Sequence, residues 1–500
     1  MNTPIRRVAM AVIIMVVALL ANATYVQVFK ADSLRADSRN NRVLLDEYAR
    51  QRGAITADGT VIATSTPIDG RLKFLRTYPT GSAAAFAPVT GFYSFQYGST
   101  GIEQYENSIL NGNDDRLFGQ RFLDMFSGRD PRGGNVVTTI NPRMQKAAYE
   151  AMRNGCTGGC RGAVVALEPN TGKILALVSS PSYDPNKLAS HDQAVREENW
   201  ARWNSADSVS DPMLNRAINQ LYPPGSTFKV VTTASALRQG VSPDIRLTAA
   251  PQITLPGTDT SLSNYGGQTC PDGSGGTVSL TQAFQYSCNT AFVQLTTERM
   301  TDARSSFTDT AGRFGLDEQP TDIPLPVSSS TVGEVSDLAA LGQSSIGQRD
   351  VRVTPLQNAM IAATVANGGV RMQPYLVDKL QSADLRTLHT TQPSTINSPI
   401  DADQAETLTQ LMILSERHTA GAGGAVSIAS KTGTAEHSEV SGADETPYSW
   451  YIAFGPSSNA KVAVAVIVEN GDLGASSTGG AVAAPIGRAV INARLGGAGG

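Results

Sequence analysis

The sequence predicts an α+β protein in which one antiparallel sheet is covered by helices and an apolar helix precedes the folded part. Apolar runs typical of strands occur at residues 162–180 and again at 426–470, with stretches of helical character between them. Early and late strands with helices between them fit one shared sheet on which the helices pack. The third observation is an apolar run from Val8 to about Phe29, which is long enough to cross a bilayer as one helix.

The overall composition is that of an ordinary globular protein. Of the 500 residues, 41% are hydrophobic and 17% are charged, and the net charge of −4 is spread without long runs. We therefore find no sign of a basic nucleic-acid-binding surface. The four histidines are scattered without a His-x-x-x-His pair, so neither a catalytic metal site nor a cofactor is predicted.

The apolar N-terminal run predicts a single-pass membrane anchor. Arg6 and Arg7 precede it, which places the N-terminus in the cytoplasm and the remaining chain outside the cell membrane. A cleaved signal peptide is the alternative, because Ala21-Asn22-Ala23 resembles a small-residue cleavage site. The apolar run continues to Phe29 beyond that point, which favours an uncleaved anchor. Both alternatives place the rest of the chain outside the cytoplasm.

Four segments are predicted from the changes in composition. They are a cytoplasmic tail and anchor (1–30), a small irregular N-terminal domain (31–155), a larger α+β domain (156–494) and a frayed tail (495–500). Asp58-Gly59 predicts a hairpin in the N-terminal domain, and Asn141 with Pro142 predicts the start of a helix, with Gly155 just past its end. In the larger domain we expect a hairpin around 169–172, helices at 226–239, 280–298, 355–367 and 483–495, and strands at 426–436, 448–456 and 461–470.

The four cysteines fit an oxidising location outside the cytoplasm. Cys156 and Cys160 lie in a short glycine-rich loop, and we interpret them as a local disulfide, with Cys270–Cys288 as the second one. Four cysteines allow three pairings, and the sequence alone does not choose among them. Four free buried thiols are the alternative.

Ser226 and Lys229 form a Ser-x-x-Lys pair at a predicted helix start. The pair follows Pro223-Pro224-Gly225, so the chain arrives extended and then turns into a helix that Gly240 would end. Residues three apart share one helix face, and the apolar neighbours of Lys229 predict that its stem is buried. Burial lowers the pKa of a lysine, and such an amine can activate a serine as a nucleophile. An N-cap serine beside an extended surface lysine is the structural alternative.

Two further short motifs carry the same kind of chemistry. Ser287 and Asn289 lie on a predicted tight connection between two helices, the first of which begins with a Ser279/Gln282 capping box. Lys431-Thr432-Gly433-Thr434 lies within a predicted strand, where a glycine lets another backbone approach closely. That arrangement suits an edge strand that binds a peptide-like substrate. Each motif alone is weak. A second Ser-x-x-Lys match, Ser458/Lys461, lies in a predicted turn and is set aside.

In this order the three motifs are those of serine β-lactamases and penicillin-binding proteins. The chain resembles the class B penicillin-binding D,D-transpeptidases over nearly its whole length. Arg52-Gly53-x-Ile55 and Gly101-Ile102-Glu103 are similar to motifs of the family's N-terminal pedestal, which is of the dimerisation type. The short pedestal and the Ser287-Cys288-Asn289 form of the second motif resemble actinobacterial, especially mycobacterial, members. The family fold implies a five-stranded antiparallel sheet with helices on both sides and an all-helical subdomain.

The resemblance implies a role for each motif residue. Ser226 would attack a stem peptide ending in D-Ala-D-Ala, with Lys229 as general base. Ser287 and Lys431 would pass a proton to the leaving amine, and Asn289 would hold the substrate amide. Thr432 and Thr434 would bind the terminal carboxylate next to Gly433, and β-lactams would trap the serine. Cys288 is unusual inside this motif, and a Cys270–Cys288 disulfide would brace it.

The resemblance also implies partners and leaves alternatives open. Class B proteins often work with a polytopic glycosyltransferase of the shape, elongation, division and sporulation (SEDS) family. A D,D-carboxypeptidase differs only in the acceptor, and a β-lactamase would need an additional water-activating base, whose Glu-x-x-Leu-Asn motif is not found between Asn289 and Lys431. A non-catalytic scaffold for wall synthesis is the alternative from another class. The expected function is therefore peptidoglycan D,D-transpeptidation in cell-wall synthesis and division.

Overall fold

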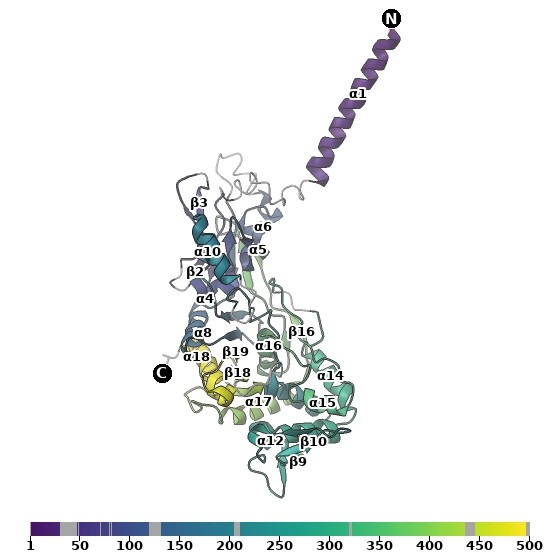
Figure 1. Ribbon diagram of the computed structural model, residues 1–500, viewed down its shortest axis with the longest axis vertical. Helices are drawn as coiled ribbons and strands as arrows, with labels where there is room; N and C mark the ends of the chain where they lie inside the picture. Colours follow the sequence, from purple (N-terminus) through teal and green to yellow (C-terminus); the bar gives the residue numbers. More distant parts are fainter. Residues whose placement is uncertain are drawn as a thin grey trace.

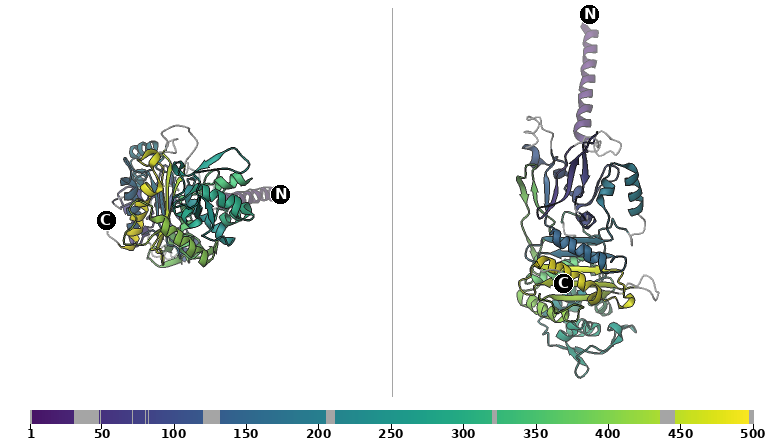
Figure 2. Two further views of the ribbon diagram at one scale, coloured as in Figure 1. Left: turned by 90° about the horizontal axis from the view of Figure 1, so that it is seen from below. Right: turned by 90° about the vertical axis from the view of Figure 1, so that its left-hand side faces the viewer.

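The computed structural model describes residues 2–30, 48, 50–70, 72–79, 81, 83–119, 132–204, 211–319, 323–435 and 446–496. The chain forms a protruding N-terminal helix, then an N-terminal sheet module, then a larger sheet layered with helices, and finally a mostly helical end (Figure 1). The last helix returns to the larger sheet and lies beside the middle of the molecule (Figure 2).

The predicted membrane anchor is one continuous helix. It consists of α1 (Asn2–Thr24) and a π-helical turn, η1 (Tyr25–Phe29), and it extends away from the folded body (Figure 1). The stretch Thr3–Phe29 has 27 residues and a mean hydropathy of 2.3, and none of it is buried in the protein. At about 1.5 Å per residue, this helix exceeds the roughly 30 Å of a bilayer core. By length and composition it can therefore cross a membrane.

The N-terminal module is built on a six-stranded sheet with the order β15-β14-β6-β1-β2-β3. The predicted hairpin is confirmed, because β1 and β2 pair in antiparallel fashion around Asp58 and Gly59, which have φ angles of 44° and 74°. The strands are β1 (Ile55–Ala57), β2 (Thr60–Pro67), β3 (Phe74–Thr77), β6 (Asn135–Thr138), β14 (Val377–Gln381) and β15 (Thr387–Thr390).

Two strands of this sheet, β14 and β15, come from within the part of the chain that forms the larger domain. β14 pairs with β6 through Val377 and Thr138, and β15 pairs with β14. The predicted N-terminal domain contained only residues 31–155, and nothing in the local pattern of 377–390 predicts this pairing. Because the chain leaves the larger domain and returns to it through β14 and β15, the two parts are joined by backbone hydrogen bonds as well as by the polypeptide.

The second sheet is the predicted antiparallel sheet. Its order is β17-β18-β19-β7-β8, with every neighbouring pair antiparallel. The hairpin at 169–172 is confirmed, as are the three late strands. The strands are β7 (Gly162–Leu167), β8 (Ile174–Ser180), β17 (Ala429–Ala435), β18 (Tyr448–Gly455) and β19 (Val462–Val468).

Helices cover both faces of this five-stranded sheet (Figure 1). Side chains alternate between the faces along each strand, so Trp450 of β18 joins one apolar core and its neighbour Tyr451 joins the other. The core around Tyr451 includes residues of α8 (Pro142–Asn154) and α18 (Ala484–Leu495). The core around Trp450 includes residues of α16 (Pro355–Ala366) and α11 (Lys229–Arg238). The predicted caps Asn141 and Gly155 of α8 are present.

The subdomain that was expected to be all-helical also carries two small β-ribbons, so that expectation is wrong in this detail. β9 (Arg246–Thr248) pairs with β12 (Thr277–Ser279), and β10 (Gln252–Thr254) pairs with β11 (Ser261–Ser263). The helices here are α12 (Leu280–Gln285), α13 (Asn289–Gln294), η5 (Leu295–Arg299), α14 (Ala303–Arg313), α15 (Leu338–Ser344) and α17 (Ala402–Glu416). The other elements are α4 (Ala83–Thr90), β4 (Tyr93–Ser94), β5 (Gly98–Ser99), α5 (Gly101–Tyr105), α6 (Asn107–Leu110), η2 (Asp115–Leu117), α9 (Pro185–Ala189), α10 (Gln193–Trp203), η3 (Gly225–Phe228), η4 (Tyr265–Gly267), β13 (Arg371–Met372), β16 (Thr395–Asn397), η6 (Gly474–Ser476) and η7 (Gly479–Ala483).

A buried carboxylate holds the N-terminal module together. Glu103 of α5 is completely buried, and its two oxygens accept hydrogen bonds of 2.6 Å from Arg52 Nε and Arg76 Nε. Tyr78 OH also donates to Glu103 at 3.2 Å. Burial raises the pKa of this carboxyl, but Arg76 and Arg52 lower it more, so the net direction is downward. Glu103 therefore stays ionised and ties α5 to β3 and to the segment before β1.

We expect Glu103→Gln to lower the free energy of unfolding of the N-terminal module by about 3–5 kcal/mol at pH 7, since one partner of a buried ion pair is lost. Thermal melts of wild type and variant would measure this. Because the folded-state pKa is depressed, the carboxylate stabilises above its unfolded pKa, and this contribution is lost as the pH falls through the folded value. The difference in the free energy of unfolding between wild type and variant should therefore become smaller at acidic pH.

A matched control is Asp309→Asn, which removes an exposed carboxylate that pairs with Arg238 and Arg313. The side chain of Asp309 is 53% exposed, so the expected loss is at most about 1 kcal/mol. Equal shifts in the two variants would contradict the role assigned to Glu103.

Candidate functional site

Ser226 lies in the 3-10 turn η3, which leads directly into α11. The predicted helix start at Ser226 is confirmed, but the first turn of the helix expected at 226–239 is a 3-10 turn, which is tighter than an α-helix. Gly225 has a φ of 52°, and a Cβ there would lie 2.8 Å from the carbonyl oxygen of Thr434. Only glycine fits this conformation and this close approach. The predicted C-terminal glycine, Gly240, is left-handed with a φ of 76°.

Lys229 is completely buried and reaches three other motif residues. Its Nζ lies 3.0 Å from Ser226 Oγ, 2.7 Å from Ser287 O, 3.2 Å from Ser287 Oγ and 2.7 Å from Asn289 Oδ1. The ring centroid of Phe292 is 5.2 Å away. The structure thus brings the first two motifs together around one amine, and Lys229 does not extend to the surface.

The contacts of Lys229 determine which part of its nitrogen faces Ser226. Ser287 O and Asn289 Oδ1 can only accept hydrogen bonds, so they occupy two N–H groups of Lys229. The amide of Asn289 is oriented by its other end, because Nδ2 donates to Ser263 O at 3.0 Å. The remaining position on Nζ faces the hydroxyls of Ser226, at 3.0 Å, and of Ser287, at 3.2 Å. In the ammonium this position is a third N–H, whereas in the neutral amine it is the lone pair, which can accept the Ser226 proton.

Ser287 and Asn289 lie where α12 ends and α13 begins. The predicted capping box of Ser279 and Gln282 is present at the start of α12. The second helix begins at Asn289, one position earlier than expected. Ser287 has a φ of 61°, which is uncommon for a residue with a side chain and is typical of functional sites. This left-handed residue forms the tight connection that points both polar side chains toward Lys229.

Lys431 reaches the same centre from the five-stranded sheet. It lies on β17, the edge strand, and is completely buried. Its Nζ donates to Ser287 Oγ at 2.9 Å and to Thr432 O at 3.0 Å, and the ring of Phe284 is 5.8 Å away. The hydroxyl of Ser287 therefore lies between the two lysines.

The pKa values of both lysines are lowered. Burial, together with the nearby charge of Lys431, holds the pKa of Lys229 well below its usual value. Burial lowers the pKa of Lys431 to about 7. Two ammonium groups that share one buried hydroxyl repel each other, so at least one of them has a strong tendency to lose its proton near neutral pH.

The remaining motif residues follow Lys431 along the free edge of the sheet. A Cβ on Gly433 would lie 2.7 Å from Pro224 O, so the strand can approach the turn before Ser226 only because this residue is glycine. Thr432 and Thr434 are partly buried and alternate with Lys431 and Gly433 along the strand. β17 pairs with β18 on one side, and no described strand pairs with its other edge.

Both expected disulfides are present. Cys156 and Cys160 are bonded in the loop after α8, and Cys270 and Cys288 are bonded in the helical end. The second disulfide holds Cys288, which lies between Ser287 and Asn289, against the loop before β12. It therefore braces the connection that carries the second motif, and the described chain has no free cysteine.

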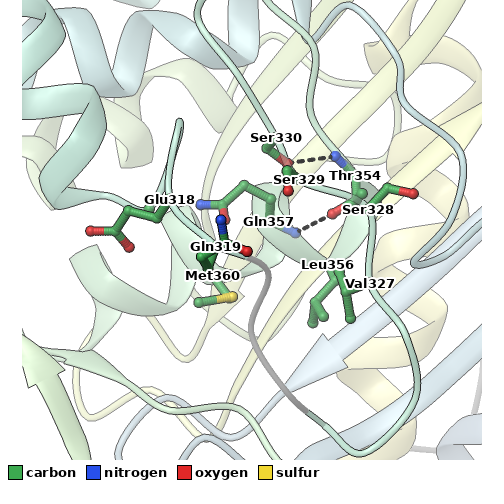
Figure 3. A pocket seen from close by; sticks show the side chains of 11 residues that line it. Glu318, Gln319, Val327, Ser328, Ser329, Ser330, Thr354, Leu356, Gln357 and Met360 are labelled. Carbon is green, nitrogen blue, oxygen red and sulfur yellow. Dashed lines mark hydrogen bonds between the residues drawn. The ribbon is translucent and has the colours of Figure 1, made fainter.

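Two other polar features do not form part of the site. The second Ser-x-x-Lys match is exposed in the turn between β18 and β19, where Lys461 Nζ donates to Asn459 Oδ1 at 3.2 Å. A small cavity of about 20 Å³ is lined by hydroxyl and amide side chains near the start of α16 (Figure 3). There Thr354 N donates to Ser330 Oγ and Gln357 N donates to Thr354 Oγ1, both at 3.1 Å. The second bond caps α16, the first ties Ser330 to the residue before that helix, and the cavity has room for about one water molecule.

Sequence reasoning missed the residues that support the second motif. Ser263, at the end of β11, accepts from Asn289, and Asn264 Oδ1 accepts from Thr290 N at 3.0 Å. The rings of Phe284 and Phe292 face the two lysines. The aromatic positions are recognisable as apolar helix positions, but no local signal links the ribbon at 252–263 to Asn289. Among the described residues no cluster of three or more His, Cys, Asp or Glu side chains could hold a metal ion.

The arrangement can perform acyl transfer by a serine nucleophile. It contains a hydroxyl, a buried amine of lowered pKa within hydrogen-bonding distance, and a second lysine linked through a serine. The sheet edge beside it is suited to an extended peptide.

Comparison with known protein families gives two matches. The penicillin-binding protein transpeptidase domain matches residues 162–492, and the penicillin-binding protein A dimerisation domain matches residues 52–136. The transpeptidase match contains all five strands of the larger sheet, whereas the dimerisation match contains β1, β2 and β3 of the N-terminal sheet, and β14 and β15 of that sheet fall within the transpeptidase match.

Individual relatives are similar over the whole chain. The peptidoglycan D,D-transpeptidase PbpA of Mycolicibacterium smegmatis is 56% identical over 497 residues, covering 99% of both chains. PbpA of Mycobacterium tuberculosis strain H37Rv is also 56% identical over 99% of both chains. The ceftriaxone acyl-enzyme complex of penicillin-binding protein A from M. tuberculosis superimposes with a TM-score of 0.85 at 56% identity, covering 90% of this chain and 100% of that one.

Because the Cys270–Cys288 disulfide lies within the second motif, its removal should make the backbone of that motif more mobile. In a Cys270→Ser/Cys288→Ser variant we expect faster amide hydrogen exchange at residues 286–290, together with a loss of about 3 kcal/mol in stability from the opened loop. The matched control is Cys156→Ser/Cys160→Ser, whose shorter loop predicts a loss of about 2 kcal/mol. Unchanged exchange at 286–290 in the first variant would show that the disulfide does not brace the motif.

Proposed function

This chain belongs to the penicillin-binding transpeptidases, and from that premise we propose that its peptidoglycan D,D-transpeptidation proceeds through an acyl-enzyme on Ser226. The observation that carries the proposal is the distance of 3.0 Å between Ser226 Oγ and the buried Nζ of Lys229. Acyl-enzyme complexes of the 56% identical M. tuberculosis relative support the same chemistry for this chain. The substrate is a peptidoglycan stem peptide ending in D-Ala-D-Ala.

In the first half-reaction Lys229 acts as the general base. Its lone pair takes the Ser226 proton while Oγ bonds to the carbonyl carbon of the penultimate D-Ala. The bond to the terminal D-Ala then breaks, and the leaving amine needs a proton. Ser287 Oγ supplies it, because this hydroxyl contacts both Lys229 and Lys431 and can be reprotonated by either. D-Ala leaves and the acyl group remains on Ser226.

The sheet edge and the helix start bind the substrate around this bond. The backbone N–H groups of Ser226 and Thr434 form the oxyanion hole, which the close approach of Gly225 to Thr434 supports. The hydroxyls of Thr432 and Thr434 bind the terminal carboxylate beside Lys431, and the backbone of Gly433 allows the close contact. Asn289 holds the amide of the donor peptide while it orients Lys229.

In the second half-reaction an amine from a neighbouring stem peptide attacks the acyl carbon. As the new amide bond forms, Lys229 takes a proton from the amine and passes it to Ser226 Oγ, the ester bond to Oγ breaks, and a peptide crosslink is left. A β-lactam resembles the D-Ala-D-Ala end and acylates Ser226 in the same way. Its ring-opened product keeps the leaving group tethered, so the amine acceptor is excluded and the enzyme is trapped.

We also propose how the protein is placed in the cell. The helix Thr3–Phe29 anchors it in the cell membrane as a single span, with Arg6 and Arg7 in the cytoplasm and the catalytic part outside. Residues 31–155 act as a pedestal and residues 156–494 as the transpeptidase domain, with 495–500 as a tail. A polytopic SEDS-type glycosyltransferase is the proposed membrane partner, and crosslinking in cell division is the proposed role.

The proposal predicts the outcome of labelling the purified protein with a fluorescent penicillin. Wild type should carry a stable label, and Ser226→Ala should carry none, because the nucleophile is gone. Rapid loss of the label from wild type would indicate a β-lactamase. Absence of label from wild type would favour a non-catalytic scaffold. Incubation with a stem peptide and an amine acceptor, with separation of crosslinked and trimmed products, distinguishes a transpeptidase from a D,D-carboxypeptidase.

The lowered pKa values predict a bell-shaped pH dependence for the second-order rate constant of acylation. The constant should rise as Lys229 loses its proton and becomes a base. The constant should fall as the pH passes about 7, where Lys431 loses its positive charge. That charge supports the hydrogen bond to Ser287 and attracts the terminal carboxylate of the substrate. Lys431→Arg keeps a charge at that position, so the falling limb should move to higher pH. A rate constant that stays level from pH 6 to 9 in wild type would contradict this assignment.

A further inference from the structure

A second carboxylate cluster lies at the end of β19, away from the motif residues. Glu469 directly follows the strand and is 9% exposed. Its Oε2 accepts from Arg161 Nε at 2.6 Å, and its Oε1 accepts from Arg216 Nε at 3.2 Å and from Tyr222 OH at 2.6 Å. The backbone N–H of Glu469 also donates to Arg161 O at 2.8 Å. Both the carboxylate and the backbone of Glu469 are therefore fixed by hydrogen bonds.

Tyr222 connects this cluster to the segment that leads into Ser226. Its ring is buried and meets Tyr448 and Trp450 edge to face, with centroids 5.4 and 5.9 Å away. Its backbone N–H and C=O both bond to Val353, at 3.0 and 2.9 Å. Burial and the adjacent Glu469 raise the pKa of the Tyr222 phenol, so the hydroxyl stays protonated and donates.

Each residue between Tyr222 and Ser226 is fixed in turn. Trp450 Nε1 donates to Pro223 O at 2.9 Å, Thr227 Oγ1 donates to Pro224 O at 2.9 Å, and Gly225 N donates to Gly347 O at 3.0 Å. Because these hydrogen bonds hold every residue of the segment, a shift of Tyr222 also moves Ser226. Lys229 is held independently by its own contacts with Ser287 and Asn289, so such a shift changes the distance between Oγ and Nζ.

We propose that Glu469 is a positioning residue for the acyl transfer, which sets the place of Ser226 through the hydroxyl of Tyr222. The inference rests on the proposed role of Ser226 as nucleophile. The side chain of Glu469 contacts Arg161, Arg216 and Tyr222, so it acts on Ser226 through Tyr222 and the residues that follow it. The bond between Tyr222 and Glu469 therefore influences the rate of acylation more than the binding of the donor.

The protein contains a matched control for this bond on the opposite face of the sheet. Tyr451 OH donates at 3.0 Å to Glu416 Oε2, and Glu416 Oε1 accepts from Arg488 Nε at 2.9 Å. Tyr451 is as buried as Tyr222, and its hydroxyl likewise meets a buried carboxylate that is paired with an arginine. Tyr451 belongs to the core beneath α8 and α18, whereas Tyr222 belongs to the core that contains α11.

The experiment compares Tyr222→Phe with Tyr451→Phe in the full-length protein. Stopped-flow acylation by a fluorescent penicillin at several concentrations separates the rate constant of acylation from the dissociation constant of the preceding complex. We expect Tyr222→Phe to lower the rate constant about tenfold with little change in the dissociation constant, because a displacement of about 1 Å can cost about 100-fold. Tyr451→Phe should lower the melting temperature by a similar amount and leave the rate constant unchanged.

A rate constant for Tyr222→Phe within about twofold of that for Tyr451→Phe would overturn the inference, since the bond would then serve stability alone. A double variant tests the route through the phenol. Glu469→Gln added to Tyr222→Phe should leave the rate constant of the single Tyr222→Phe variant unchanged, and a further fall would overturn the assigned route. Labelling of Ser226→Ala would instead refute the role of Ser226, so the two proposals fail in different ways.

Discussion

The site depends on the burial of two lysines around a single hydroxyl. Lys229 and Lys431 are both completely buried, and both contact Ser287 Oγ. Water is largely removed from both amines, and their charges repel each other, so the pair is most stable when one of them is neutral. The carbonyl acceptors around Lys229 decide which part of the amine faces Ser226. The same constraint that makes this arrangement costly for folding therefore produces a base at neutral pH.

Holding that arrangement requires three chain segments that are distant in sequence. The α12–α13 connection carries Ser287, and both η3 with α11 and strand β17 bring a lysine to it. Each of the three segments is fixed by a different structural feature. The turn before Ser226 and strand β17 meet through Gly225 and Gly433, where a side chain would collide with backbone. The α12–α13 connection is held by a left-handed serine and a disulfide. Rigid support of this kind maintains catalytic distances that a flexible loop would lose.

Buried carboxylates paired with arginines recur at the joints of the molecule. Glu103 ties together the N-terminal module, Glu416 joins the end of α17 to α18, and Glu469 joins the end of β19 to the segment before Ser226. Each carboxylate also accepts from a buried tyrosine hydroxyl. A charge removed from water is costly unless it is fully paired, so each cluster permits few alternative arrangements of the elements it joins.

The sequence by itself determined the elements and the motifs. Alternation, turn residues and caps identified the five strands of the catalytic sheet, the hairpin at Asp58-Gly59 and helix α8, because these signals act over a few residues. Only the tertiary structure decided that β14 and β15 complete the N-terminal sheet and that Ser263 orients Asn289. It also decided that Lys431 shares a hydroxyl with Lys229, from more than 200 positions away. Such contacts depend on which faces pack together, and no short-range pattern along a chain encodes the distance between two buried amines.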